Sequence, residues 1–167
     1  YSAAFNSLNG DVQAGDSISY RVFARDNSTA HNTDSTTLRT FKIIAQATSC
    51  IGTGTTSTSY PFYTLYEDSR TQMLYTASEI ITGGGGAGFI SKLGFTILTV
   101  GSPAMSGFSV KMQTISGSTI STWTTTGWSE VYTSSAYTPP GTGLQYINLA
   151  TPYYWNGTGN LLIEVCF

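Results

Sequence analysis

The sequence predicts an all-β protein built as an antiparallel sandwich, and three observations predict it. Ser and Thr together make up 48 of the 167 residues, and there are 11 Tyr. Thr and Tyr suit pleated, half-buried surfaces. The 18 Gly supply turns, and turn signals recur between short segments in which apolar and polar residues alternate. No segment has the period of a long amphipathic helix.

Residues 1–49 have the pattern of the last strands of a domain. Apolar and polar side chains alternate in residues 18–25, which indicates a strand, and the alternation returns in residues 41–46 after the polar loop 26–37. Residues 1–8 are a candidate third strand. Three strands rarely make a stable sandwich alone. We therefore expect this segment to be the C-terminal part of a domain, or to pack on the domain that follows.

A second domain is expected over residues 50–167. Its entry lies in the Gly-, Ser- and Thr-rich segment 48–59, which reads as a linker or an ordered domain start. About eight short strands separated by turn signals follow, a pattern typical of a sandwich or jelly roll. We expect these strands at residues 60–66, 71–81, 90–100, 108–113, 120–123, 128–132, 144–149 and 161–166.

Two of these segments differ in how clearly they are specified. Residues 90–100 are the clearest core strand, since Leu93, Phe95 and Ile97 fall on one face. Residues 71–81 are ambiguous between helix and strand, and their alternation favours strand.

Composition excludes several classes of protein. The net charge is −2, only 10% of residues are charged, and Lys and Arg are scattered singly. Nucleic-acid binding needs a concentrated basic stripe, so we do not expect it. No apolar stretch reaches 18 residues, so no membrane insertion is expected. The chain opens at Tyr1 without Met and stops at Phe167 in an apolar run, and we expect it to be a piece of a longer protein.

One resemblance lies in the N-terminal segment. The stretch GDSISYRVFARDNSTAHNT covers residues 15–33, and FKII follows at residues 41–44. Together they resemble the final strands of fibronectin-type-III-like and immunoglobulin-like modules of bacterial surface proteins, where a Tyr-x-Val-x-Ala-x-Asp strand enters an Asn-rich turn. The resemblance implies that residues 1–49 end such a domain.

A second resemblance covers most of residues 55–167. YTASE at residues 75–79, GFISKLGF at residues 88–95 and WNGTGNLL at residues 155–162 follow in order. This order is similar to β-sandwich modules of large surface proteins exported by the type IX secretion system of Bacteroidota. The resemblance implies a secreted, extracellular or cell-surface module, often repeated and placed beside adhesion domains or accessory to hydrolases. It brings no catalytic residue set.

These inferences lead to a functional expectation. We expect a non-catalytic structural or adhesive module of a large secreted cell-surface or filament protein. Its expected partners are neighbouring β-sandwich domains or copies of itself, with surface glycans as a further candidate. The alternative is a carbohydrate-binding accessory domain of a secreted hydrolase.

Enzymatic motifs are absent from the sequence. His31, the single histidine, lies in a polar loop, and no G-x-S-x-G elbow accompanies it. Glu67 and Asp68 are adjacent, so on a strand they would face opposite sides rather than form a catalytic pair. The glycine run at residues 83–88 lacks the Lys-Ser/Thr of a phosphate-binding loop. We expect no catalytic residue and no cofactor.

Metal binding has one weak candidate. Asp26 and Asp34 flank amide side chains in the loop 26–37, which would suit calcium. The loop lacks the order of an EF-hand, and a turn closed by its own Asx side chains is the alternative. Zinc is not expected with one His and two distant Cys.

Two pairings are candidates for structural roles. Cys50 and Cys166 are too far apart in sequence for a C-x-x-C motif, and they either form a disulfide or serve as small buried side chains. Arg70 lies near three acids in sequence, and we expect an ion pair with one of them, Glu79 being the candidate.

Aromatic side chains are the remaining candidates for binding. Trp123, Trp128 and Trp155 would stack on sugar rings if they form an exposed strip. The alternative is core and edge packing, the usual role of aromatics in sandwiches.

Overall fold

The computed structural model describes residues 16–42 and 47–167. The chain forms two compact units, Tyr1–Ala47 and Thr48–Phe167. The division falls two residues before the boundary expected from the sequence. The candidate strand at residues 1–8 and the end of the candidate strand at residues 41–46 lie outside the described residues.

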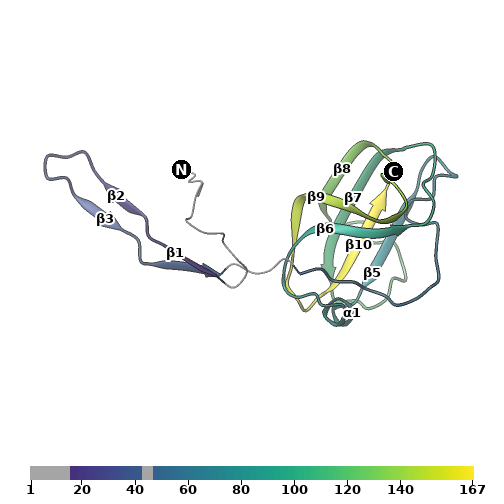
Figure 1. Ribbon diagram of the computed structural model, residues 1–167, viewed down its shortest axis with the longest axis horizontal. Helices are drawn as coiled ribbons and strands as arrows, with labels where there is room; N and C mark the ends of the chain where they lie inside the picture. Colours follow the sequence, from purple (N-terminus) through teal and green to yellow (C-terminus); the bar gives the residue numbers. More distant parts are fainter. Residues whose placement is uncertain (1–15, 43–46) are drawn as a thin grey trace. The chain divides into compact units, whose positions relative to one another are not determined.

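The described part of the first unit is a two-stranded antiparallel ribbon (Figure 1). Strand β1 (Ser17–Tyr20) pairs with β4 (Arg39–Lys42), and β2 (Phe23–Arg25) pairs with β3 (Thr33–Ser35). The polar loop between β2 and β3 forms the tip of this hairpin.

The two faces of the ribbon differ in chemistry. On one face Ile18 lies opposite Phe41, and the Tyr20 and Phe41 ring centroids are 6.3 Å apart. On the other face the hydroxyls of Ser19 and Thr40 are 2.7 Å apart. Among the described residues of this unit every side chain except Ile18 is exposed. The ribbon is therefore amphipathic, and the described residues of this unit do not cover its apolar face.

The second unit contains a four-stranded antiparallel sheet (Figure 1). Its strands are β5 (Arg70–Tyr75), β10 (Asn160–Cys166), β7 (Met105–Ile115) and β8 (Ser129–Tyr137), in the spatial order β5-β10-β7-β8. Strand β10 is central, and six of its seven residues pair with β5 on one side while all seven pair with β7 on the other.

A second layer faces this sheet. Strands β6 (Gly88–Ile97) and β9 (Gly143–Trp155) pair antiparallel, with a register shift between Ile90 and Lys92. The core lies between the two layers and is apolar throughout. Its buried members are Ile80, Met105, Phe108, Val110, Met112, Val131, Ile147, Leu149, Trp155, Leu161, Ile163 and Val165.

This arrangement confirms the predicted all-β antiparallel sandwich. Leu161, Ile163 and Val165 alternate toward the core, as the period-2 pattern of the last strand predicts. Of the strands expected in this unit, residues 60–66 and 120–123 are not strands. Residues 60–66 instead contribute individual aromatic side chains to the core. The centroid of the Phe62 ring lies 5.2 Å from that of Phe95 on β6.

A short helix corrects the expectation for residues 71–81. Strand β5 ends at Tyr75, and helix α1 (Ala77–Thr82) follows. Thr76 caps the helix: its hydroxyl accepts a bond from the Glu79 N–H, and the Glu79 carboxylate accepts one from the Thr76 N–H at 2.7 Å. This reciprocal capping box overrides the alternation of the preceding strand.

Within the described part of the chain, no helix has the length and apolar character needed to span a bilayer.

Candidate functional site

The outer face of the four-stranded sheet carries a row of polar side chains. Glu164 on β10 lies opposite Gln72 on β5 and Lys111 on β7. Neighbours in register share a face, and the residues on either side of Glu164 in β10 point into the core. The three polar side chains therefore stand together on the side of the sheet that faces away from the core.

Glu164 is a buried carboxylate with several donors. The residue is 2% exposed. Its Oε2 accepts hydrogen bonds from Arg70 Nε and from Gln72 Nε2, each at 2.7 Å, and Arg70 Nη2 lies 2.6 Å from it. A buried carboxylate needs such partners, because removing an unpaired charge from water costs roughly several kcal/mol.

Electrostatics at Glu164 work in opposite directions. Burial pushes the pKa of Glu164 upward, while hydrogen bonds from Gln72 and Arg70 and the positive charge of Arg70 lower it. The lowering effects prevail, so the pKa of Glu164 lies below its ordinary value. Burial of Cys166, together with the neighbouring carboxylate of Glu164, raises the pKa of the Cys166 thiol.

The loop between β7 and β8 is fastened to this row at one residue. The Thr124 carbonyl accepts hydrogen bonds from Arg70 Nη2 and Gln72 Nε2, each at 2.7 Å, and from Trp128 Nε1 at 3.3 Å. The Thr124 N–H donates to Gln72 Oε1 at 3.1 Å. Four hydrogen bonds therefore hold the backbone of Thr124 against the sheet.

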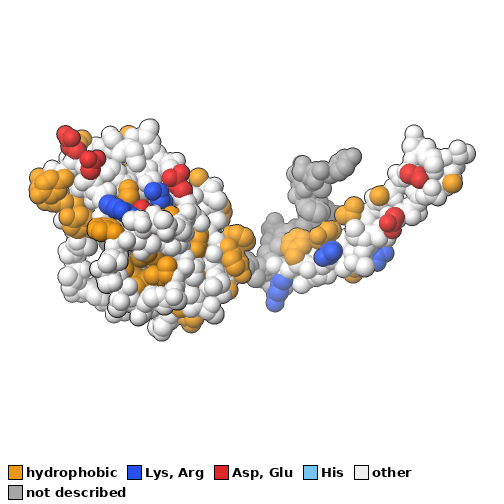
Figure 2. All heavy atoms as spheres, turned by 180° about the vertical axis from the view of Figure 1, so that it is seen from behind, with side chains coloured by type: hydrophobic (Ala, Val, Ile, Leu, Met, Phe, Trp, Pro, Cys, Tyr) orange, Lys and Arg blue, Asp and Glu red, His pale blue; other side chains and the backbone are white. Residues whose placement is uncertain are grey.

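Trp123 precedes this fastened residue and is 57% exposed. The guanidinium carbon of Arg70 lies 5.1 Å from the centroid of its ring, a cation–π contact. Figure 2 shows basic and acidic side chains near one another on one face of the second unit. The cluster thus combines an exposed aromatic ring with fixed polar groups.

The expected ion pair between Arg70 and Glu79 is wrong. Arg70 pairs with Glu164, 94 positions away in the sequence. The Glu79 carboxylate is used by the capping box, where it also accepts a bond from the Thr76 hydroxyl at 2.7 Å. Proximity in sequence pointed to Glu79, whereas the pairing depends on the register of β5 and β10.

The candidate disulfide between Cys50 and Cys166 is not formed, since both are free thiols. The Cys50 N–H donates to the carbonyl of Gly83, the residue that follows α1, at 3.0 Å. The start of α1 bonds Asn160, the first residue of β10, and Cys166 ends that strand. Six steps of about 3.3 Å separate the two ends, whereas disulfide-bonded Cα atoms lie within about 7 Å of each other.

The three tryptophans do not form a strip. Trp155 is 1% exposed, and its Nε1 donates to the Gly159 carbonyl at 2.7 Å. The prediction that Trp155 stacks on sugar rings is therefore wrong, because its ring is buried. Trp128 is half-buried and serves to hold Thr124. Trp123 is the exposed member of the set.

The two calcium candidates lie in different elements, Asp26 in a closed turn and Asp34 on strand β3. Asp26 accepts hydrogen bonds from the Ser28 hydroxyl at 2.7 Å, from the Asn32 N–H at 3.0 Å and from Asn32 Nδ2 at 2.8 Å. These bonds, that of Ser28 first, lower the pKa of Asp26. Asp34 instead accepts from the Ser35 N–H at 2.7 Å. The alternative of an Asx-closed turn accounts for the carboxylate of Asp26, and His31 sits exposed in that turn with φ 47°.

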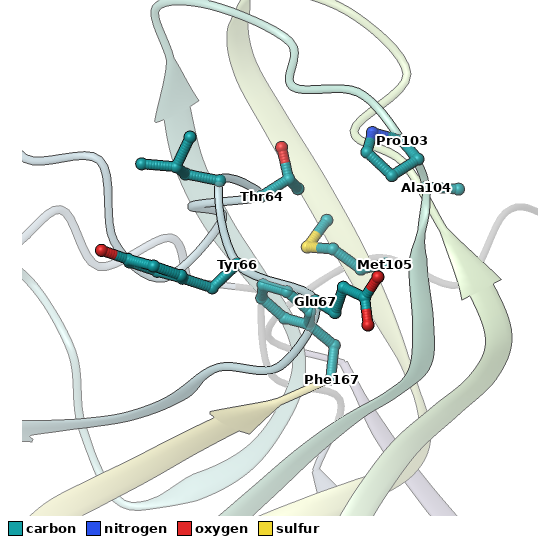
Figure 3. Close-up of a pocket in the computed structure, with 8 residues that line it drawn as sticks. Thr64, Tyr66, Glu67, Pro103, Ala104, Met105 and Phe167 are labelled. Atoms are coloured by element: carbon teal, nitrogen blue, oxygen red, sulfur yellow. The ribbon is translucent and has the colours of Figure 1, made fainter.

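A shallow hollow lies elsewhere on the second unit (Figure 3). It encloses about 250 Å³ and is lined by residues 64–67, residues 103–105 and Phe167. Figure 3 shows Phe167, Met105 and Glu67 close to one another, with Tyr66 directed away from them. Glu67 is the charged side chain of this lining, so the hollow holds no pair of carboxylates. Across residues 16–42 and 47–167, no three His, Cys, Asp or Glu side chains gather as a metal site would require.

Comparison with protein-family models, with curated proteins and with solved structures finds no match for this chain.

Sequence reasoning missed most members of the Arg70–Glu164 cluster. Gln72 and Glu164 are polar residues at interior positions of strands that otherwise read as core, which was the available signal. The role of Thr124 had none, because it acts through its backbone.

Proposed function

We propose that the chain is a non-catalytic structural or adhesive module of a large secreted cell-surface or filament protein. The observation that carries the proposal is the amphipathic ribbon of the first unit. The resemblance of its sequence to the last strands of surface-protein modules supports the same assignment, as does the resemblance of residues 55–167 to β-sandwich modules of type IX secretion substrates.

The ribbon is a poor candidate for an independent fold. A two-stranded hairpin is marginally stable in water, and a third strand or a packed face is needed. Tyr20 and Phe41 remain 41% and 44% exposed on the apolar face. Full burial of an exposed apolar side chain contributes about 1.5–3 kcal/mol, so covering the part of each ring that is still exposed contributes about 1 kcal/mol. A neighbouring β-sandwich domain, or a second copy of the chain, is the partner that we propose for this face.

The second unit has the chemistry of a robust scaffold. Strand β10 is hydrogen-bonded on both sides, and five successive residues in it, 161–165, are buried. Its stability comes from packing and backbone hydrogen bonds rather than from any reacting group. A load-bearing or spacing role needs no more than this.

Surface labelling tests the proposal. Antibodies raised against residues 48–167 are applied to intact cells of the source organism, and the labelled polypeptide is sized after extraction. We expect labelling without permeabilisation and a parent chain much larger than 17.8 kDa. Labelling only after lysis, with a cytosolic protein as the control, contradicts the proposal.

A further inference from the structure

We propose that Trp123 is the stacking platform of a saccharide site, with a pyranose ring of a polysaccharide as its ligand. The inference rests on the proposed adhesive function and supplies its target. The platform comprises Trp123, its support Arg70, and the polar groups of Lys111 and the loop residues around Thr124. No motif in the sequence assigns a site to these residues as a group.

The first step is that Trp123 is exposed and held in place. Its neighbour Thr124 makes four hydrogen bonds with the side chains of Arg70, Gln72 and Trp128. The guanidinium of Arg70 lies over the indole. A ring that is already ordered loses little conformational entropy when a ligand stacks on it, which favours binding.

The support beneath Trp123 is itself fixed. Arg70 is held by the buried carboxylate of Glu164 through Nε and Nη2. Arg70 contacts the indole, and Trp123 nevertheless remains 57% exposed, so ring surface is left for a ligand to stack on.

Further polar groups belong to the same outer face and to the same loop. The Lys111 Nζ lies 3.8 Å from Glu164 Oε1, beyond hydrogen-bond distance, so its N–H donors can turn toward a ligand. Exposed hydroxyl-bearing residues precede and follow Trp123 in the loop: Ser121, Thr122, Thr125 and Thr126.

This combination fits a sugar better than another macromolecule. A pyranose offers an apolar face of C–H groups for the indole and a rim of hydroxyls for neighbouring donors and acceptors, as binding sites with few placed polar groups require. A protein interface of stable size needs a buried apolar centre larger than one ring. The charges of Arg70, Lys111 and Glu164 sum to +1, too few for a nucleic acid.

The charge of the sugar is left to the test. Lys111 favours a carboxylate on the ligand, and Glu130, exposed and opposite Lys111 in the β7–β8 pair, opposes it. Neutral and uronic-acid chains share the pyranose ring. The probes below therefore include both kinds.

The experiment is isothermal titration of the full 167-residue chain with cellohexaose, xylohexaose, laminarin and polygalacturonate. We expect saturable binding of at least one probe, weakened at least about tenfold by Trp123→Ala and partly retained by Trp123→Phe. Phe89→Ala is the matched control, since Phe89 is also an exposed aromatic, 72% exposed, on the other layer. It should bind like the unchanged chain.

Three outcomes overturn the inference. The first is that no probe binds the unchanged chain. The second is that Phe89→Ala weakens binding as much as Trp123→Ala does, and the third is that Trp123→Ala leaves binding unchanged. Thermal unfolding of each variant checks that the fold is kept. None of these outcomes bears on surface labelling, so failure of the saccharide site leaves the structural role standing.

Discussion

Arg70 Nη2 lies 2.6 Å from Glu164 Oε2 and thereby joins the edge strand β5 to the central strand β10 on the outer face of the sheet. The same guanidinium bonds the Thr124 carbonyl and lies over the Trp123 ring. One residue thus neutralises a buried carboxylate, fastens the β7–β8 loop and supports the exposed tryptophan.

Arg70→Met should therefore destabilise the second unit. The substitution keeps the aliphatic stem but removes the closest counter-charge of Glu164. Breaking a buried pair from one side costs about 3–5 kcal/mol, and we expect about 3 because Lys111 remains nearby. Urea unfolding of the two proteins measures the difference.

Arg25→Met is the control for that substitution, because Arg25 is exposed on the ribbon. It should change the free energy of unfolding by less than about 0.5 kcal/mol. Equal unfolding midpoints for Arg70→Met and the unchanged chain would show that the pair does not hold the sheet.

Glu164 should also make stability depend on pH. Its pKa in the folded state lies below the value of 4.5 expected for an unfolded chain. The ionised group therefore stabilises the fold above about pH 4.5, and this contribution is lost as the pH falls through the folded-state pKa. Glu164→Gln removes the titration, so the stability advantage of the unchanged chain should shrink between pH 6 and pH 3.

Comparing those two proteins cancels the other acids. Asp26 and Glu79 also have lowered pKa values, but both proteins keep them. An advantage that stays constant from pH 6 to pH 3, measured by chemical unfolding, would be inconsistent with a paired and ionised Glu164.

The capping box should contribute to stability through Thr76. Thr76→Ala removes the hydroxyl that accepts from the Glu79 N–H at 3.3 Å, at a cost of about 1 kcal/mol. Thr76→Ser keeps the oxygen and should stay close to the unchanged chain. If Ser is as destabilising as Ala in thermal or urea unfolding, the capping bond is not the cause.

Gly159 should be intolerant of a side chain. A Cβ at this position would overlap Thr114 Cγ2, whereas a Cβ at Gly86 would meet no atom within 4 Å. We expect Gly159→Ala to destabilise by about 1–3 kcal/mol and Gly86→Ala to be near neutral. Similar unfolding curves for the two variants would argue against the close approach of the 156–159 turn to β7.

The sequence predicts the layers of the fold better than its pairings. Alternation locates β6 and β10 because their faces separate core from outside, as Leu93 and Ile163 show. It does not locate the end of β5, where a four-residue capping signal outweighs a continuing alternation. A capping box involves only four residues, so a hydrophobic period averaged over a longer window does not detect it.

The candidate site could be predicted only in part. The sequence marks both Trp123 and Trp155 as candidates because both are tryptophans. Only their burial in the fold distinguishes them. The partner of Arg70 lies 94 positions away. Such a contact follows from strand register, which the sequence of either strand alone does not determine.

Hydrogen exchange of the ribbon tests the central claim most directly. Amide exchange of residues 16–42 is measured in the isolated chain and in the parent protein extracted from the cell surface, with β10 as an internal standard. If the chain is a module whose ribbon is completed by a neighbour, residues 16–42 exchange rapidly in the isolated chain and slowly in the parent, while β10 is protected in both. Equal, rapid exchange of residues 16–42 in both samples would contradict the account.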